Sequence, residues 1–169
     1  MCVDYQPKYT KLMEYQNLVE DFARRTRENL RQLTKLKDDG VEVYEVTALL
    51  NSMLGLLVFP QQRHMNTIPE TSIEQLACDG WPVPQVVGDF PQARSLRELI
   101  RYLRNAISHF NVEIIGDEEH RICGLVVWNT SPKSKEITWK AKLSISDIEV
   151  IAQKFISLIL REDAERNSQ

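Results

Sequence analysis

The 169 residues carry a net charge of −3, with 43% hydrophobic and 27% charged side chains, which is typical of one soluble globular domain, here 1–169. This negative balance argues against a nonspecific nucleic-acid coat, so any bound RNA needs a local cationic patch. Neither the N-terminus nor the longest apolar stretch, 48–59, resembles a signal peptide or a membrane-spanning helix. Cys2, Cys78 and Cys123 lack zinc-site or redox spacing. We therefore expect free thiols, a cytoplasmic location, and no metal, cofactor or membrane partner.

Two helices are predicted at the start of the chain. Apolar residues at helical spacing predict a long helix over 9–37, which Asp38-Asp39-Gly40 stops. Its many cations either form a solvated face favoured by the helix dipole or face RNA. A second, strongly apolar helix is predicted over 41–57 and ends at Pro60. Gly55 either permits close approach of another helix or weakens this one near its end.

The middle of the chain combines an irregular segment with a clear helix. Residues 60–94 are rich in proline and predict a loop with a short helix over 69–77. This loop is either a lid or dimer-contacting arm, or an ordinary surface excursion. An amphipathic helix follows, with Ser95 as its N-cap. Its expected buried side consists of Leu96, Leu99, Ile100, Leu103, Ile107 and Phe110.

Beyond this helix the apolar period changes to two. Strands are predicted over 112–115, 122–128 and 137–143, which gives a small antiparallel β-meander over 112–143. Ser146 to Glu149 has the pattern of a capping box for a last helix, and 162–169 is expected to be a flexible charged tail. The predicted fold is mostly α, an antiparallel helical bundle with the β-meander inserted before the last helix.

The polar side of the 95–110 helix carries the residues that suggest chemistry. Asn105 and His109 are four residues apart and share one helix face, and Arg101 lies one turn earlier. Arg104 lies five residues from His109, about 140° around an ideal helix. One helix therefore does not direct both groups at one phosphate. Two copies about a twofold axis would bring two sets into one cleft.

Arg104-Asn105-x-x-x-His109 resembles the Arg-x(4–6)-His signature of the HEPN superfamily, and 44–61 looks like the second helix of a plasmid- and genome-borne bacterial HEPN family. The resemblance covers roughly 44–128. It implies a HEPN-like bundle and a homodimeric, metal-independent endoribonuclease in a toxin or defence setting, with an antitoxin or regulatory protein as a further partner. In such enzymes the 2′-hydroxyl of the RNA attacks the adjacent phosphate.

The resemblance also implies roles for individual residues. His109 would act as general base or acid, and Arg104 would stabilise charge on the phosphorane. Asn105 would orient His109 or hydrogen-bond the phosphate. The RNA-binding residues would be Arg97, Arg101 and Ser108, with the two arginines steering RNA through phosphate contacts.

The residues also permit a structural interpretation. His109 could be a helix C-cap that interacts with the helix dipole, and Arg104 could form an ion pair with Glu98, Glu45 or Asp117. The chain would then be a noncatalytic HEPN-like module that dimerises or binds a partner or nucleotide.

Overall fold

The computed structural model describes residues 18–58, 65, 68–119 and 121–166, with side chains of the last helix as far as Leu160. The elements in chain order are α1 (Leu18–Asp38), α2 (Glu45–Val58), α4 (Ile73–Cys78), β1 (Gln85–Val86), α5 (Leu96–Ser108), β2 (Val112–Gly116), β3 (Ile122–Thr130), β4 (Ile137–Ser144) and α6 (Ile145–Arg166). Within these ranges, no helix combines the length and apolar character needed to cross a bilayer. Cys78 and Cys123 are free thiols, as expected, whereas Cys2 lies outside the described residues.

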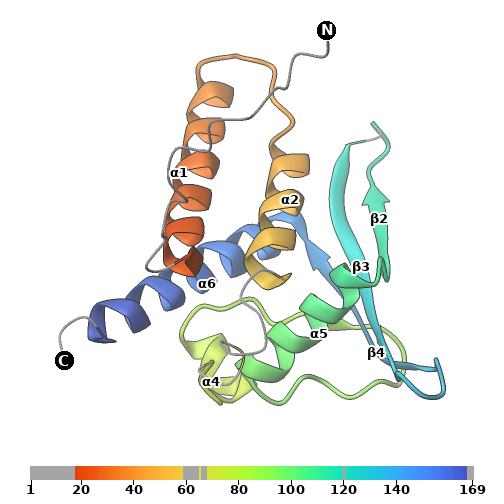
Figure 1. The fold of residues 1–169 in the computed structure, drawn as a ribbon. Helices are drawn as coiled ribbons and strands as arrows, with labels where there is room; N and C mark the ends of the chain where they lie inside the picture. The colour runs from red at the N-terminus through yellow and green to blue at the C-terminus, as the bar shows by residue number, and fades with distance from the viewer. Residues whose placement is uncertain (1–17, 59–64, 66–67, 120, 167–169) are drawn as a thin grey trace, which may run out of the picture.

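The helices pack on one another and on a four-stranded sheet. In Figure 1, α1 and α2 lie side by side, α6 passes behind them, and α5 crosses below α2 toward the sheet. The strand order is β1-β4-β3-β2, with antiparallel pairing throughout. The fully buried Trp139 of β4 packs against Tyr102 of α5, with ring centroids 5.0 Å apart. This contact fixes α5 to the sheet.

The sheet corrects the expected fold class. The β2–β3–β4 meander is confirmed, but β1 adds a fourth strand through the pairs Gln85↔Lys142 and Val86↔Ala141. The fold is therefore mixed α and β rather than a helical bundle with a small β insertion. A strand of two residues is too short to show alternation, so the sequence pattern missed β1.

The segment predicted as a loop over 60–94 is partly built into the core. Ile68, Ile73, Leu76 and Ala93 are buried, and α4 begins after its N-cap Ser72 rather than at 69. This packing rules out a purely superficial excursion for the described part of the segment. Residues 59–64 and 66–67, including Pro60, lie outside the described residues.

The first two helices differ from their predicted limits. The 9–17 part of the first predicted helix lies outside the described residues, and α2 begins at Glu45 rather than at 41. Gly55 of α2 faces the ring of Phe22 on α1, and a Cβ atom at residue 55 would collide with that ring. This contact confirms that Gly55 permits close helix approach.

The last helix begins and ends differently from its prediction. Ser144 and Asp147 exchange the capping bonds: the Ser144 amide donates to Asp147 Oδ2 (2.9 Å), and the Asp147 amide donates to Ser144 Oγ (3.1 Å). The predicted Ser146–Glu149 box is therefore wrong, because β4 passes directly into α6. α6 continues to Arg166 and so includes residues 162–166 of the predicted tail, whereas 167–169 lie outside the described residues.

Candidate functional site

The helix that carries the Arg-Asn-His motif is anchored at its start. Ser95 is the N-cap as predicted, with its Oγ accepting from the Glu98 amide (3.3 Å) and donating to Glu70 Oε2 (2.7 Å). The Leu96 amide donates to Thr71 O (2.9 Å), which ties α5 to the segment before α4. The apolar side of α5 is buried, so its polar side faces outward.

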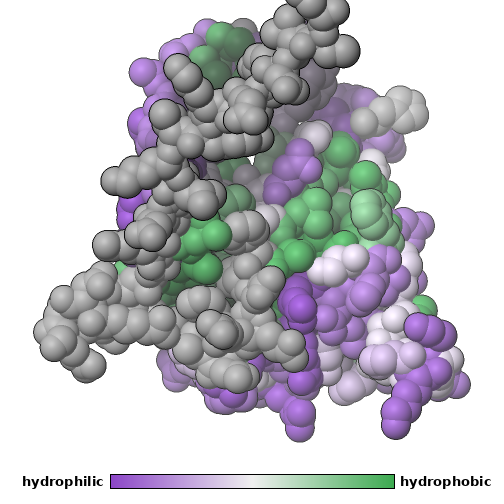
Figure 2. Space-filling view, viewed as in Figure 1, coloured by the Kyte–Doolittle hydropathy of each residue, from purple (hydrophilic) through white to green (hydrophobic). Residues whose placement is uncertain are grey.

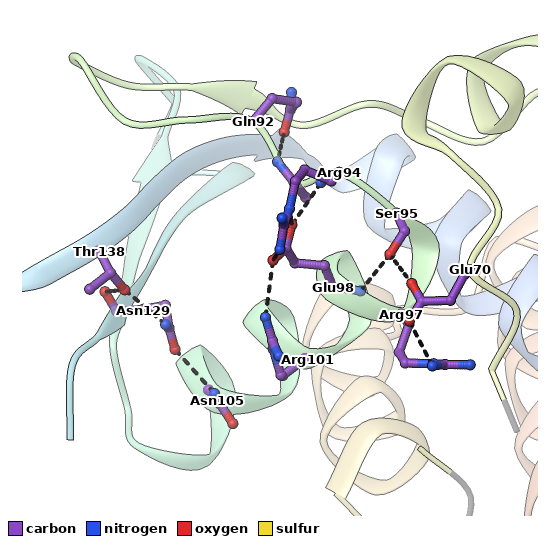
Figure 3. A network of polar contacts seen from close by, with 11 residues as sticks. Glu70, Gln92, Arg94, Ser95, Arg97, Glu98, Arg101, Asn105, Asn129 and Thr138 are labelled. Carbon is purple, nitrogen blue, oxygen red and sulfur yellow. Dashed lines mark hydrogen bonds and ion pairs between the residues drawn. The ribbon is translucent and has the colours of Figure 1, made fainter. Parts of the chain in front are cut away.

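Glu98 organises the N-terminal half of α5. Its side chain is buried, yet its Oε1 accepts from Arg94 Nη2 (3.1 Å) and Arg101 Nη2 (3.0 Å) (Figure 3). Its Oε2 accepts from the backbone amide of Arg94 (2.8 Å) and from Arg94 Nε (3.2 Å). The Arg94 side chain is the main reason that the pKa of Glu98 falls to about 2, against an opposing effect of burial. The sequence pattern gave no sign of this buried carboxylate.

Arg97 is held in a similar way. Its Nε and Nη2 donate to the carbonyl oxygen of Ile68 (2.8 and 2.6 Å), and its Nη1 donates to Glu70 Oε1 (2.6 Å). These groups line a pocket of about 330 Å³ in which two carboxylates face three guanidinium groups. Arg97 and Arg101, both predicted to contact RNA, are therefore bonded within the protein.

The C-terminal half of α5 differs from the N-terminal half in the partners of its cations. Each carboxylate considered as a structural partner of Arg104 is bonded to another cation: Glu98 to Arg94 and Arg101, Glu45 to Lys37 (2.6 Å), and Asp117 to Arg121 (2.9 Å). Across the described part of the chain, no hydrogen bond or ion pair involves the side chain of Arg104 or His109. Arg104 is half-buried, whereas His109 and its neighbour Ser108 are exposed.

The helix ends in a Schellman turn at the motif. His109 is the C-cap, and its amide donates to Asn105 O (3.1 Å), so these two motif residues lie one turn apart as predicted. The Phe110 amide donates to Ile107 O (3.2 Å) and the Asn111 amide to Ala106 O (2.8 Å). Phe110 has φ +56° and is 87% exposed. Its predicted burial is wrong, because the chain leaves the helical spiral before residue 110.

A chain of hydrogen bonds orients Asn105 from the sheet. Asn105 Nδ2 donates to Asn129 Oδ1 (3.2 Å), and Asn129 Nδ2 donates to Thr138 Oγ1 (2.9 Å) (Figure 3). The Thr138 hydroxyl donates to the backbone oxygen of Asn129 (3.3 Å). A carbonyl oxygen only accepts, so this bond fixes the polarity of the whole chain. Asn105 Oδ1 consequently points away from Asn129, as an available acceptor.

Asn129 and Thr138 were missed by sequence reasoning. Thr138 lies in the strand predicted over 137–143, but no local pattern connects it with a helix that ends thirty residues earlier. Asn129 lies 24 residues from Asn105 in the chain. Only the pairing of β3 with β4 and the packing of α5 on β3 bring these residues together.

The resulting site combines three chemical functions at one end of α5. Arg104 supplies a permanent cation, His109 supplies an imidazole that can take or give a proton, and Asn105 supplies an acceptor held by the sheet. Among the described residues, no group of three His, Cys, Asp or Glu side chains could hold a metal ion. The arrangement suits proton transfer beside an anion.

Comparison with known proteins assigns the chain to a family. The family model described as HEPN pEK499 p136 matches residues 7–166, nearly the whole chain. No curated protein and no solved structure matches significantly.

Proposed function

Because the chain belongs to this HEPN family, we propose that it is a homodimeric, metal-independent endoribonuclease with Arg104 and His109 as catalytic residues. The observation that carries the proposal is the contrast along α5. Arg97 and Arg101 are bonded to carboxylates, whereas the side chains of Arg104 and His109 have no polar partner within the described residues. Arg104 and His109 can therefore bind a ligand without first breaking a bond to another side chain of the described residues.

The proposed reaction is an internal transesterification. The 2′-hydroxyl oxygen bonds to phosphorus, the bond from phosphorus to the 5′-oxygen breaks, and the products are a 2′,3′-cyclic phosphate and a 5′-hydroxyl. One imidazole takes the proton of the 2′-hydroxyl, and a second donates a proton to the departing 5′-oxygen. Arg104 stabilises the charge that builds up on the phosphoryl oxygens.

In this scheme we assign Asn105 to the positioning of His109. One Nδ2 hydrogen of Asn105 is donated to Asn129, which leaves its Oδ1 as an acceptor on the side away from the sheet. The oxygen can accept from an imidazole N–H one turn away, which would hold the ring in one tautomer and orientation. This is the function of the bonds from Thr138 through Asn129 to Asn105.

A second copy of the chain supplies the second imidazole. One chain contributes a single His109, and Arg104 lies five positions away from it on α5. Figure 2 shows an apolar surface over α2 and the neighbouring strands, and the exposed apolar residues of these elements include Leu54, Val58 and Ile114. Such a surface fits a contact with another protein chain.

The test is cleavage of single-stranded RNA in the presence of EDTA. We expect wild type to produce 2′,3′-cyclic phosphate ends, and His109→Ala to lose about 10²–10⁴-fold in rate without loss of folding. Arg31→Ala, which removes an exposed ion-paired arginine of α1, should leave the rate unchanged. A wild-type dimer that never cleaves RNA would contradict the proposal and favour the noncatalytic module.

A toxin or defence role in the cytoplasm, restrained by an antitoxin or regulatory protein, extends the same proposal. We expect expression of wild type to slow bacterial growth and His109→Ala to remove the effect. Equal growth with both forms would contradict this role.

A further inference from the structure

Phe110 is unfavourable for the isolated chain in two ways. At 87% it is the most exposed large apolar side chain among the described residues, and its backbone is left-handed, with φ +56°. Left-handed backbone is disfavoured for any residue with a Cβ, and a bulky ring gains nothing from burial here. A glycine would end the helix without this cost.

The end of α1 shows that alternative in the same molecule. There the Gly40 amide donates to Lys37 O (2.9 Å) and the Val41 amide to Leu36 O (2.9 Å), the same two bonds that end α5. Gly40 occupies the left-handed position with φ +79°. The fold therefore uses glycine at one Schellman turn and an exposed phenylalanine at the other.

The backbone that carries the Phe110 ring is held in place next to His109. Residue 111 is tied to the helix by its amide, and its carbonyl oxygen accepts from the Trp128 amide of β3 (3.1 Å). The turn is thus held by α5 on one side and by the sheet on the other. Consecutive Cα atoms are about 3.8 Å apart, so Phe110 and His109 leave the backbone at the same end of α5.

We propose that Phe110 stacks on an unpaired RNA base beside the phosphodiester on which His109 acts. The inference rests on the proposed function, because it assumes that His109 faces a nucleotide. An aromatic ring that stands open to solvent on a held turn can accept the flat face of a base. Purines offer a larger face than pyrimidines, so the ring should favour a purine at this position.

The surroundings favour a base over a second copy of the chain. The ring follows Ser108 and His109 and precedes Asn111, all polar, and the unpaired Arg104 lies on the same helix end. An anchor for another protein typically lies within an apolar patch. The aliphatic residues of the apolar surface belong to other elements, and a ring that is 87% exposed is barely packed against any of them.

The experiment compares two replacements by glycine at left-handed positions. Phe110→Gly is the test variant, and Lys135→Gly is the matched control, because Lys135 is exposed in the β3–β4 turn with φ +62°. Both should raise the thermal midpoint by about 2–4 °C, because glycine adopts the left-handed backbone without strain. The binding probes are labelled 2′-O-methyl oligonucleotides of adenosine and of uridine, which lack the attacking hydroxyl.

We expect Phe110→Gly to weaken binding of the adenosine oligonucleotide by about 5- to 150-fold, as loss of one stacked base predicts, with a smaller loss for uridine. Phe110→Trp should retain binding, Phe110→Leu should lose it, and Lys135→Gly should leave it unchanged. Unchanged binding by Phe110→Gly, or equal binding by the Leu and Trp variants, would overturn the proposal.

A role for the ring in dimerisation would give a different result. Phe110→Gly would then dissociate the dimer in sedimentation experiments, and RNA binding would return at high protein concentration, which would overturn the stacking proposal. Binding that depends on Phe110 in a protein that never cleaves RNA would leave the base contact valid and contradict only the nuclease. A wild type that binds neither oligonucleotide contradicts both.

Discussion

The N-terminal and C-terminal halves of α5 carry similar side chains in different electrostatic settings. In the N-terminal half, Arg97 bonds to Glu70, and Arg101 bonds to the buried Glu98. In the C-terminal half, the side chains of Arg104 and His109 have no polar partner in the described part of the chain. A row of arginines along a helix therefore does not define a uniform cationic surface. The carboxylates around it decide which cations remain available to a ligand.

The difference has a simple electrostatic basis. A guanidinium that donates to a carboxylate must exchange that bond for one to phosphate, and the exchange leaves a carboxylate unpaired. Glu98 makes this cost high because it is only 8% exposed. Arg104 gives up no such bond when it approaches an anion. The N-terminal half thus serves to hold the helix in place, and the C-terminal half is available for chemistry.

The largest expected effect is on the rate of RNA cleavage, which should distinguish the two halves of α5. Arg104→Ala should lower the rate of RNA cleavage by about 10²–10³-fold, because it removes charge stabilisation at the phosphate. Arg97→Ala should change the rate by less than about threefold and should lower the thermal midpoint instead, because it breaks bonds to Ile68 and Glu70. Equal losses of activity would show that both halves bind the substrate.

The next effect concerns the stability of the N-terminal half. The pKa of Glu98 is lowered from 4.5 to about 2 in the folded chain, which corresponds to about 3 kcal/mol of stabilisation. Because the folded pKa is the lower one, this stabilisation is complete above about pH 4.5 and is lost as the pH falls toward 2. Glu98→Gln should remove it at pH 7 and flatten the acid dependence, measured by urea unfolding between pH 7 and pH 3.

Glu28 provides the matched control for this measurement. Its pKa is also lowered to about 2, mainly by its hydrogen bond to Arg31, but the pair is exposed on α1. Solvent screening weakens such pairs, so Glu28→Gln should destabilise the chain less than Glu98→Gln. Equal destabilisation by the two variants would mean that burial of Glu98 contributes nothing.

The smallest effect tests the positioning of Asn105 from the sheet. Thr138→Val removes the hydroxyl that fixes the Asn129 amide, and it should lower kcat for RNA by about tenfold through misorientation of Asn105. Thr138→Ser keeps the hydroxyl and should restore the wild-type rate. If Thr138→Ser and Thr138→Val lower kcat equally, the Thr138 hydroxyl has no part in positioning Asn105.

Local patterns predicted most elements of this fold, because helix and strand periodicity and capping act over a few residues. Ser95 as N-cap and the three strands of the meander followed from such patterns. The two-residue β1 did not, since it is defined only by its pairing with β4. The exposure of Phe110 was also unpredictable, because backbone bonds end α5 two residues earlier than apolar spacing suggested.

The site was predictable only in part. Arg104, Asn105 and His109 form a recognisable motif, but their availability depends on partners distant in sequence. Arg97 meets Glu70 across 27 residues, and Asn105 meets Asn129 across 24. Such contacts follow from tertiary packing rather than from spacing along the chain.

The direct passage from β4 into α6 makes this junction intolerant of insertions. No residue separates Ser144 from Ile145, and the reciprocal bonds of Ser144 and Asp147 span the boundary. One residue added here would turn α6 by about 100° about its axis. Ile151 and Phe155 would then rotate out of the core, so natural variation in chain length has to be accommodated at some other point of the fold.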